Sequence, residues 1–472
     1  MSDIFSKLSF RNSSPLGQIL LLAGISFLTI LPMVFIGVFK GPDTAQHIQF
    51  ASTYEDSILS GDLYPSWGGN ENSGYGSVSV RFYPPIFSFL FGLAHILTGD
   101  WQAALWIVNL LFTLIGGVGC FLLAKEFIQK EFAFFAGVIF ILMPYHLSEI
   151  HINSFYAEYA GCSILAFSFL FVTRICRNNH PIDVLGLAVS FALLILTHIP
   201  SAVIGSLGLF VYALALMIEK KEFRLNFVKL SNAAVFGLAA TSFYWLRFIS
   251  EMDWFRSTRF VTDGTFDYSE HFLLTIPSDK VFGIWYNNQI LIAVVLLVIC
   301  SAVARSRMAK RQSPAGLTPM YVIFAFSVFM MTPISKPLWM FIPYLSKVQF
   351  VWRWQVVTCI VGAVLISAGI KPLLSFFKDA SNWKTPLYLM TVFSILFASS
   401  AYFKIVSKYK KDYIPTGEFN AWAERQSRSM GPYYFWTPVT TRDAFMIKDK
   451  VVVPGRAVKI LVQKPDETVF SV

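Results

Sequence analysis

The chain has 472 residues, of which 55% are hydrophobic and 14% are charged, and its net charge at pH 7 is +10. A soluble protein of this composition would lack the polar side chains needed to cover its surface, so these values exclude an ordinary soluble fold and indicate a protein that faces lipid. The basic charge does not indicate nucleic-acid binding, because the Lys and Arg residues flank apolar runs and form no single basic face.

Apolar runs separated by charges, Gly and Pro recur along the chain, and we predict an all-α integral membrane protein with about 11 spanning helices. The first run is too long for a signal-peptide core and lacks a cleavage site, so we expect it to remain as an anchor. The predicted spans are Leu16–Val38, Trp101–Ala124, Phe132–Leu147, Ala160–Ile175, Val184–Leu196, Ser201–Ile218, Leu230–Leu246, Trp285–Val303, Leu317–Met331, Trp352–Ile370 and Pro386–Ala401.

The distribution of Lys and Arg predicts which side of the membrane each loop occupies, because basic residues near span ends stay in the cytoplasm. With the N-terminus inside, every cytoplasmic loop is basic and the C-terminus lies outside. This holds only if the apolar segment Pro84–Leu97, which is short and begins with two prolines, is a re-entrant or interfacial helix. The predicted cytoplasmic residues are Lys7, Arg11, Lys125, Lys130, Arg174, Arg177, Lys220, Lys221, Arg224, Arg305, Arg307, Lys310, Arg311, Lys371, Lys378 and Lys384.

We divide the chain into a polytopic membrane domain, residues 1–403, and a small extracytoplasmic segment, residues 404–472. In the second part, apolar and polar residues alternate over Lys448–Val453 and Ala457–Val462, which predicts strands. The five cysteines lie in or beside apolar runs without the spacing of metal ligands, so we predict no metal site from them.

The first outer loop contains Asp43 and His47, which share one face if a short helix begins at Pro42. A carboxylate there lies at the membrane surface, within reach of a lipid headgroup; the alternative is an Asp that caps the helix. Arg81 stands where a lipid phosphate would lie, and Arg is a natural phosphate partner, although it could also simply extend toward water.

The other outer loops supply further candidates. His151 and Glu158 lie between two spans, where ionisable groups are costly unless water, a partner or a ligand receives them; a solvated turn is the alternative. His198 closes another outer turn, where a lone His is usually a packing residue. Arg353, between two tryptophans at a span end, is a candidate for holding phosphate or sugar. Tyr64 and Tyr83 suit an interfacial aromatic belt and are also candidate substrate-binding residues.

The order of these residues resembles GT-C-fold membrane glycosyltransferases, and most closely the bacterial membrane proteins labelled 6-pyruvoyl-tetrahydropterin synthase related. The resemblance covers residues 15–370. It is carried by Asp43 with His47, Gly61-x-x-Tyr64-Pro65-x-Trp67, Gly76, Phe82-Tyr83-Pro84-Pro85, Glu158, His198, Tyr244-Trp245-Leu246 and Phe350-x-Trp352-Arg353.

The resemblance implies a GT-C-like domain whose catalytic residues are Asp43, as the base or its organiser, and Glu158, as the second acidic motif. The family commonly has an acidic pair at the second motif and Pro before Trp-Arg, whereas this chain has one Glu and Val351. The need for a divalent cation stays open. The implied substrate-binding residues are His47, Tyr64, Arg81, Tyr83, His151, His198 and Arg353.

The residues themselves suit this chemistry. A sugar on polyprenyl phosphate already carries a good leaving group, so one carboxylate to accept a proton and cations to receive the phosphate charge suffice. We therefore predict an inverting glycosyltransferase that moves a hexose-like sugar from polyprenyl phosphate to a lipid-linked glycan or another surface acceptor. The expected location is a bacterial plasma membrane, with the site on the periplasmic side. The alternatives are a transporter or flippase and a non-catalytic envelope assembly protein.

Overall fold

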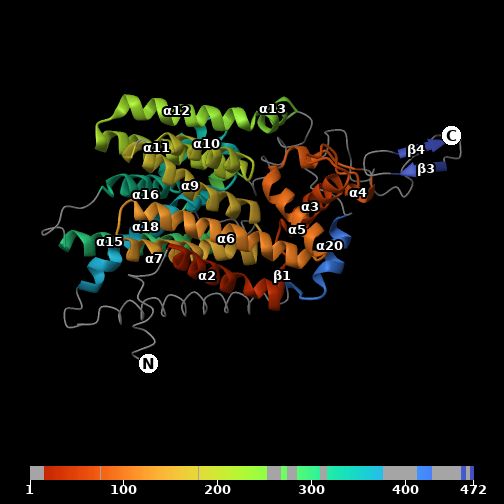
Figure 1. The fold of residues 1–472 in the computed structure, drawn as a ribbon, viewed down its shortest axis with the longest axis horizontal. Helices are drawn as coiled ribbons and strands as arrows, with labels where there is room; N and C mark the ends of the chain where they lie inside the picture. The colour runs from red at the N-terminus through yellow and green to blue at the C-terminus, as the bar shows by residue number, and fades with distance from the viewer. Residues whose placement is uncertain are drawn as a thin grey trace.

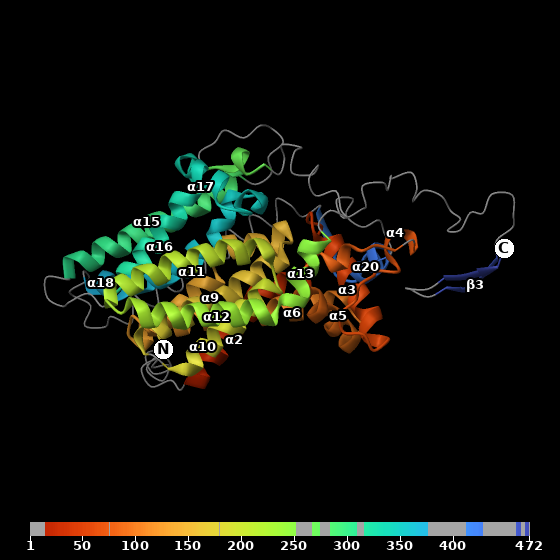
Figure 2. The ribbon, with the colours of Figure 1, turned by 90° about the horizontal axis from the view of Figure 1, so that it is seen from above.

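The computed structural model describes residues 15–74, 76–178, 180–251, 267–273, 284–308, 316–375, 412–427, 459–463 and 468–471. Long helices lie side by side as a bundle, and shorter elements gather at one end of it, as Figures 1 and 2 show. The long helices are α2 (Pro15–Phe35), α6 (Trp101–Lys125), α9 (Tyr156–Arg177), α11 (Ile199–Lys220), α12 (Phe223–Ala240), α15 (Ile284–Met308) and α18 (Gln355–Ser375).

Shorter helices lie within the bundle and at one end of it. The α-helices among them are α3 (Thr44–Leu59), α4 (Glu71–Gly74), α5 (Pro85–Thr98), α7 (Lys130–Ile141), α8 (Pro144–Ser148), α10 (Pro181–Ile195), α13 (Ser242–Ser250), α16 (Thr318–Met330), α17 (Lys336–Phe341) and α20 (Phe419–Ser427). Single turns of other helix types are η1 (Ser79–Arg81), η2 (Glu149–Asn153), η4 (Tyr268–His271), η5 (Pro333–Ser335), η6 (Leu345–Val348) and η7 (Val351–Trp354).

Among the described residues, six helical stretches are long and apolar enough to cross a membrane, or up to eight if each of two bent helix pairs is one span. The bends are 68° between α12 and α13 and 87° between α16 and the segment Pro333–Phe341. A multi-pass helical membrane protein is therefore confirmed. The predicted number of 11 spans is not confirmed and stays a prediction. One predicted span, Pro386–Ala401, lies outside the described residues, and α10 is shorter than a usual span.

The apolar segment that was predicted not to cross the membrane forms helix α5. It has 14 residues, fewer than the about 20 that a spanning helix needs, and it lies beside α3 at the end of the bundle, shown in Figure 1. Pro at its start and Gly99 in the left-handed conformation at its end explain its limits.

The middle of the bundle is packed closely around α6. Gly116 and Gly117 bring α7 near, since a Cβ at Gly116 would lie 2.2 Å from the ring of Phe140 and a Cβ at Gly117 would lie 2.6 Å from Ile141. Small residues at helix contacts are how membrane helices approach one another. Close packing of α6, α7 and α9 fixes the helix ends that carry the candidate site.

The first predicted span is wrong at its C-terminal end. Helix α2 stops at Phe35, and Gly37–Phe39 forms strand β1, which pairs antiparallel with β2 (Tyr413–Pro415). A periodicity argument cannot find this strand, because its partner comes from the far end of the chain. The predicted strand at Lys448–Val453 lies outside the described residues, and β3 (Lys459–Gln463) pairs antiparallel with β4 (Thr468–Ser471).

Several predicted cytoplasmic residues meet at the end of the bundle where α6 and α9 terminate. Nε of Arg174 donates to Glu126 at 2.8 Å, Nη2 of Arg177 donates to the carbonyl of Gly316 at 3.0 Å, and Lys371 donates to Gln129 at 3.2 Å. These basic loops therefore share one end, opposite the end where α6 and α9 begin.

Candidate functional site

Asp43 stands between β1 and α3, at the end of the bundle where α9, α11 and α18 begin. It is the residue before the first turn of α3, but its side chain makes no capping hydrogen bond there, so the alternative of a helix-capping Asp is not supported. Burial raises the pKa of Asp43 to about 6; the Arg353 guanidinium opposes this rise, and the Glu158 carboxylate adds to it. Asp43 thus lies within electrostatic reach of both groups.

Glu158 and Arg353 form a buried ion pair. Nε of Arg353 donates to Oε2 of Glu158 at 2.8 Å, and the side chains are 9% and 1% exposed, respectively. Nη1 of Arg353 also donates to the carbonyl of Val348 at 2.6 Å, and the hydroxyl of Tyr145 donates to Oε1 of Glu158. Buried charges persist only when they are paired and hydrogen-bonded in this way.

His198 lies near Arg353, and His47 lies near His198. His198 precedes α11, and its Nδ1 accepts a hydrogen bond from the backbone N–H of Ser201 at 3.3 Å. Burial lowers the pKa of His198 well below its ordinary value, and the nearby Arg353 and His47 lower it further. Burial lowers the pKa of His47 to about 3, so neither imidazole is a cation near pH 7.

The surroundings of His47 are aromatic. Its ring lies 5.1 Å from Phe87, 5.3 Å from Tyr156 and 5.9 Å from Tyr83, measured between ring centroids. Tyr83 in turn lies 4.7 Å from Phe50. Two residues proposed to bind substrate, His47 and Tyr83, therefore touch each other inside the fold beside Asp43.

Glu149 is a buried carboxylate near the site that the sequence reasoning did not select. It begins the π-helical turn η2, and Nδ2 of Asn153 donates to its Oε1 at 2.9 Å. Glu149 interacts electrostatically with Glu158, Arg353 and Asp43. Where the sequence indicated a lone Glu at the second acidic motif, the structure has two interacting buried acids, and the available signal was a second acidic residue in the same outer loop.

Arg81 belongs to a second cluster. Its guanidinium forms an ion pair with Glu251, and Nε of Arg247 lies 3.7 Å from the same carboxylate oxygen. Tyr64 lies under Arg247, with 5.9 Å between the guanidinium carbon and the ring centroid. The described ion pair of Arg81 is therefore with Glu251, and the expectation that Arg81 binds substrate stays a prediction.

His151 makes its described polar contacts elsewhere. Its Nε2 lies 2.8 Å from the carbonyl of Thr29 in α2, and its own carbonyl accepts a hydrogen bond from the hydroxyl of Tyr413 at 3.1 Å. These contacts tie η2 to α2 and β2. In the part of the chain that the structure describes, no three His, Cys, Asp or Glu side chains form a cluster that could hold a metal ion.

The arrangement combines a carboxylate that ionises near neutral pH with one buried guanidinium and two further acids. The backbone around Asp43 is fixed, because the hydroxyl of Thr44 donates to Ser154 at 2.8 Å and Gly41 lies against the same Ser side chain. Such a group can accept a proton from a hydroxyl while the guanidinium stabilises negative charge.

Comparisons with known proteins give a family and a fold. The family model described as "6-pyruvoyl-tetrahydropterin synthase related domain; membrane protein" matches residues 80–406. No curated protein matches the sequence.

Among solved structures, the Archaeoglobus fulgidus oligosaccharyltransferase tethered to an acceptor peptide is similar, with a TM-score of 0.50 and 13% identity over 90% of this chain. This chain spans only 60% of that enzyme. ArnT from Cupriavidus metallidurans bound to undecaprenyl phosphate has a TM-score of 0.49 and 15% identity, covering 88% of this chain and 70% of ArnT. The similarity to the oligosaccharyltransferase confirms the predicted resemblance to GT-C glycosyltransferases in fold alone.

Proposed function

We propose that this chain, which belongs to the 6-pyruvoyl-tetrahydropterin synthase related family of membrane proteins, is a glycosyltransferase. Its donor is a sugar on a polyprenyl phosphate, and its acceptor is a hydroxyl of a lipid-linked glycan or another cell-surface molecule. The reaction takes place on the extracytoplasmic face of a bacterial plasma membrane, where α3, α5 and α20 lie.

One observation carries this proposal: Asp43, whose pKa is raised to about 6, lies within electrostatic reach of the buried Glu158–Arg353 pair. A base works best when its pKa lies near the pH at which it acts, and Asp43 meets this condition. The fold shared with an oligosaccharyltransferase agrees with a transfer reaction, although it carries no information on the substrates.

The proposed step is a single displacement. The Asp43 carboxylate accepts the proton of the acceptor hydroxyl, and the hydroxyl oxygen forms a bond to the anomeric carbon of the sugar. The bond from that carbon to the phosphate oxygen breaks, and its electron pair leaves with the polyprenyl phosphate. Attack opposite the leaving group inverts the anomeric centre.

Arg353 is the proposed partner of the departing phosphate. Its Nε and Nη1 contact Glu158 and Val348, whereas Nη2 has no hydrogen bond to the described residues and can donate to a phosphate oxygen. The pairing with Glu158 fixes the guanidinium in advance, so that little reorganisation is needed when charge develops on the phosphate. Arg81 and Arg247, which share Glu251, are proposed to bind the donor headgroup more weakly.

The proposal is tested with purified protein in liposomes, polyprenyl-phosphate sugars carrying a radiolabel in the sugar, and an extract of lipid-linked glycans as acceptor. We expect label to move to the acceptor and the anomeric configuration of the product to be opposite to that of the donor. A product that retains the configuration contradicts the single displacement. Movement of an intact labelled donor across the membrane without transfer would indicate a flippase.

A further inference from the structure

The C-terminal residues 412–427, which we name the clasp, make two sets of contacts, one with β1 before Asp43 and one that leads to α3 after Asp43. The clasp lies beyond residue 406, where the family match ends. The clasp consists of β2 and α20. Figure 1 shows α20 packed beside α3 and α5 at the end of the bundle, although it follows them by most of the chain.

The first set of contacts is the strand pair β1–β2, which lies before Asp43 in the sequence. Residues Gly37, Val38 and Phe39 pair with Pro415, Ile414 and Tyr413, and the N–H of Lys40 donates to the carbonyl of Asp412 at 2.8 Å. Gly37 has a φ of +130°, and a Cβ there would lie 2.0 Å from the carbonyl oxygen of Ile414. The approach of β2 therefore requires glycine at this position.

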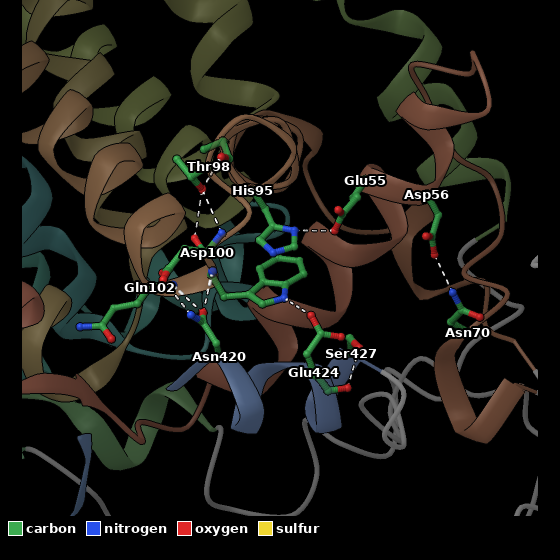
Figure 3. Close-up of polar contacts among 12 residues, drawn as sticks. Glu55, Asp56, Asn70, His95, Thr98, Asp100, Gln102, Asn420, Glu424 and Ser427 are labelled. Atoms are coloured by element: carbon green, nitrogen blue, oxygen red, sulfur yellow. Dashed lines mark hydrogen bonds and ion pairs between the residues drawn. The ribbon is translucent and has the colours of Figure 1, made fainter. Parts of the chain in front are cut away.

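The second set of contacts joins α20 to the start of α6. The side-chain oxygen of Asn420 accepts a hydrogen bond from the backbone N–H of Trp101 at 2.8 Å, and its Nδ2 donates to Asp100 at 2.7 Å. Oε1 of Glu424 accepts a hydrogen bond from the indole N–H of Trp101, also at 2.8 Å. Figure 3 shows Asn420 and Glu424 facing the start of α6 together.

The same tryptophan continues the connection to α3. The ring of Trp101 stacks on His95 of α5 with 3.7 Å between centroids and 9° between planes. Nδ1 of His95 lies 2.8 Å from Oε2 of Glu55, which belongs to α3 (Figure 3). A continuous set of contacts thus runs from Glu424 through Trp101 and His95 to the C-terminal half of α3.

Asp43 lies between these two sets of contacts, after β1 and directly before the first residue of α3. A displacement of about 1 Å in a reacting group lowers catalysis by about 100-fold, so an element that fixes both β1 and α3 determines the activity of the base. We infer that the clasp positions Asp43 for transfer, with Glu424 and Asn420 as positioning residues that never touch the substrate. This inference rests on the proposed function only for its effect on catalysis.

The test compares Glu424→Ala, which removes the acceptor for the Trp101 indole, with Glu424→Gln, which keeps an oxygen acceptor. In the full-length protein we expect Glu424→Ala to lower kcat about 10- to 100-fold with little change in KM for the donor, and Glu424→Gln to restore most of it. Glu418→Ala is the matched control, because Glu418 is an exposed acid of the same segment without a described side-chain hydrogen bond.

A second readout does not depend on activity. Hydrogen exchange of the backbone amides of Thr44–Leu59 should accelerate in Glu424→Ala and in Gly37→Ala, and should stay unchanged in Glu418→Ala. Unchanged exchange in both Glu424→Ala and Gly37→Ala contradicts the inference, whatever the wild type catalyses. Faster exchange with normal kcat in an active preparation would also contradict it, because the clasp would then stabilise α3 without positioning Asp43.

Discussion

Nε of Arg353 donates to Oε2 of Glu158 across 2.8 Å, joining two positions that lie 195 residues apart in the sequence. Glu158 is in the first turn of α9, and Arg353 is in η7, directly before α18. The pair therefore couples two helices of the bundle to the site, and its charges act on Asp43, the proposed base.

The ion pair predicts a specific pattern of stability. Arg353→Leu leaves the Glu158 carboxylate buried without its partner, and we expect a loss of about 3–5 kcal/mol in the free energy of unfolding. The double variant Arg353→Leu with Glu158→Leu removes both charges and should recover most of this loss. Denaturant titration in detergent micelles measures both values. A loss in the double variant equal to the sum of the losses in the two single variants would mean that the two residues contribute independently.

The pKa of Asp43 predicts the pH dependence of transfer. Burial raises this pKa to about 6, and the base must be ionised to accept a proton. As the pH falls through 6, Asp43 becomes protonated, so kcat/KM should decrease and approach a tenfold loss for each further pH unit. The measurement is kcat/KM from pH 4.5 to 8 in liposomes. A flat profile over this range contradicts the assignment of Asp43 as base.

Substitutions at Arg81 and Glu251 distinguish a role of Arg81 in donor binding from a purely structural role of the ion pair. If Arg81 binds the donor phosphate, Arg81→Gln should weaken donor binding about tenfold, the order of one charged hydrogen bond. Glu251→Gln removes the ion pair but keeps the cation, so it should leave binding unchanged or slightly stronger. Equilibrium binding of labelled donor to liposomes measures both. Equal weakening in the two variants would identify the pair as purely structural.

The apolar runs predicted a multi-pass helical membrane protein, because the lipid imposes one local rule on every span, whereas the number of 11 spans stays a prediction. Helix α6 has the predicted start, Trp101, and ends one residue beyond the predicted Ala124. Strand β1 was missed because its partner β2 comes from the other end of the chain. No local pattern carries that information.

The candidate site was predicted in part. Position after a span, together with the resemblance to GT-C glycosyltransferases, identified Asp43, and the resemblance identified Glu158 among the ionisable residues at a span end. The structure brings these two residues within electrostatic reach of each other. Arg81 is also a predicted substrate-binding residue, and its described ion pair is with Glu251. Glu149 was not selected, because its interaction with Glu158 depends on the π-helical turn η2, which no local sequence pattern indicates.

Asp43 is the proposed base of the glycosyl transfer, and single-turnover transfer by Asp43→Asn tests this role. Asn keeps the size of the side chain but cannot accept the proton, so we expect transfer to fall about 100- to 10,000-fold. Binding of the polyprenyl-phosphate sugar and the unfolding midpoint should stay close to wild type, because Asp43 makes no helix-capping hydrogen bond. Near-normal transfer by Asp43→Asn would contradict the account and direct attention to Glu158 and Glu149.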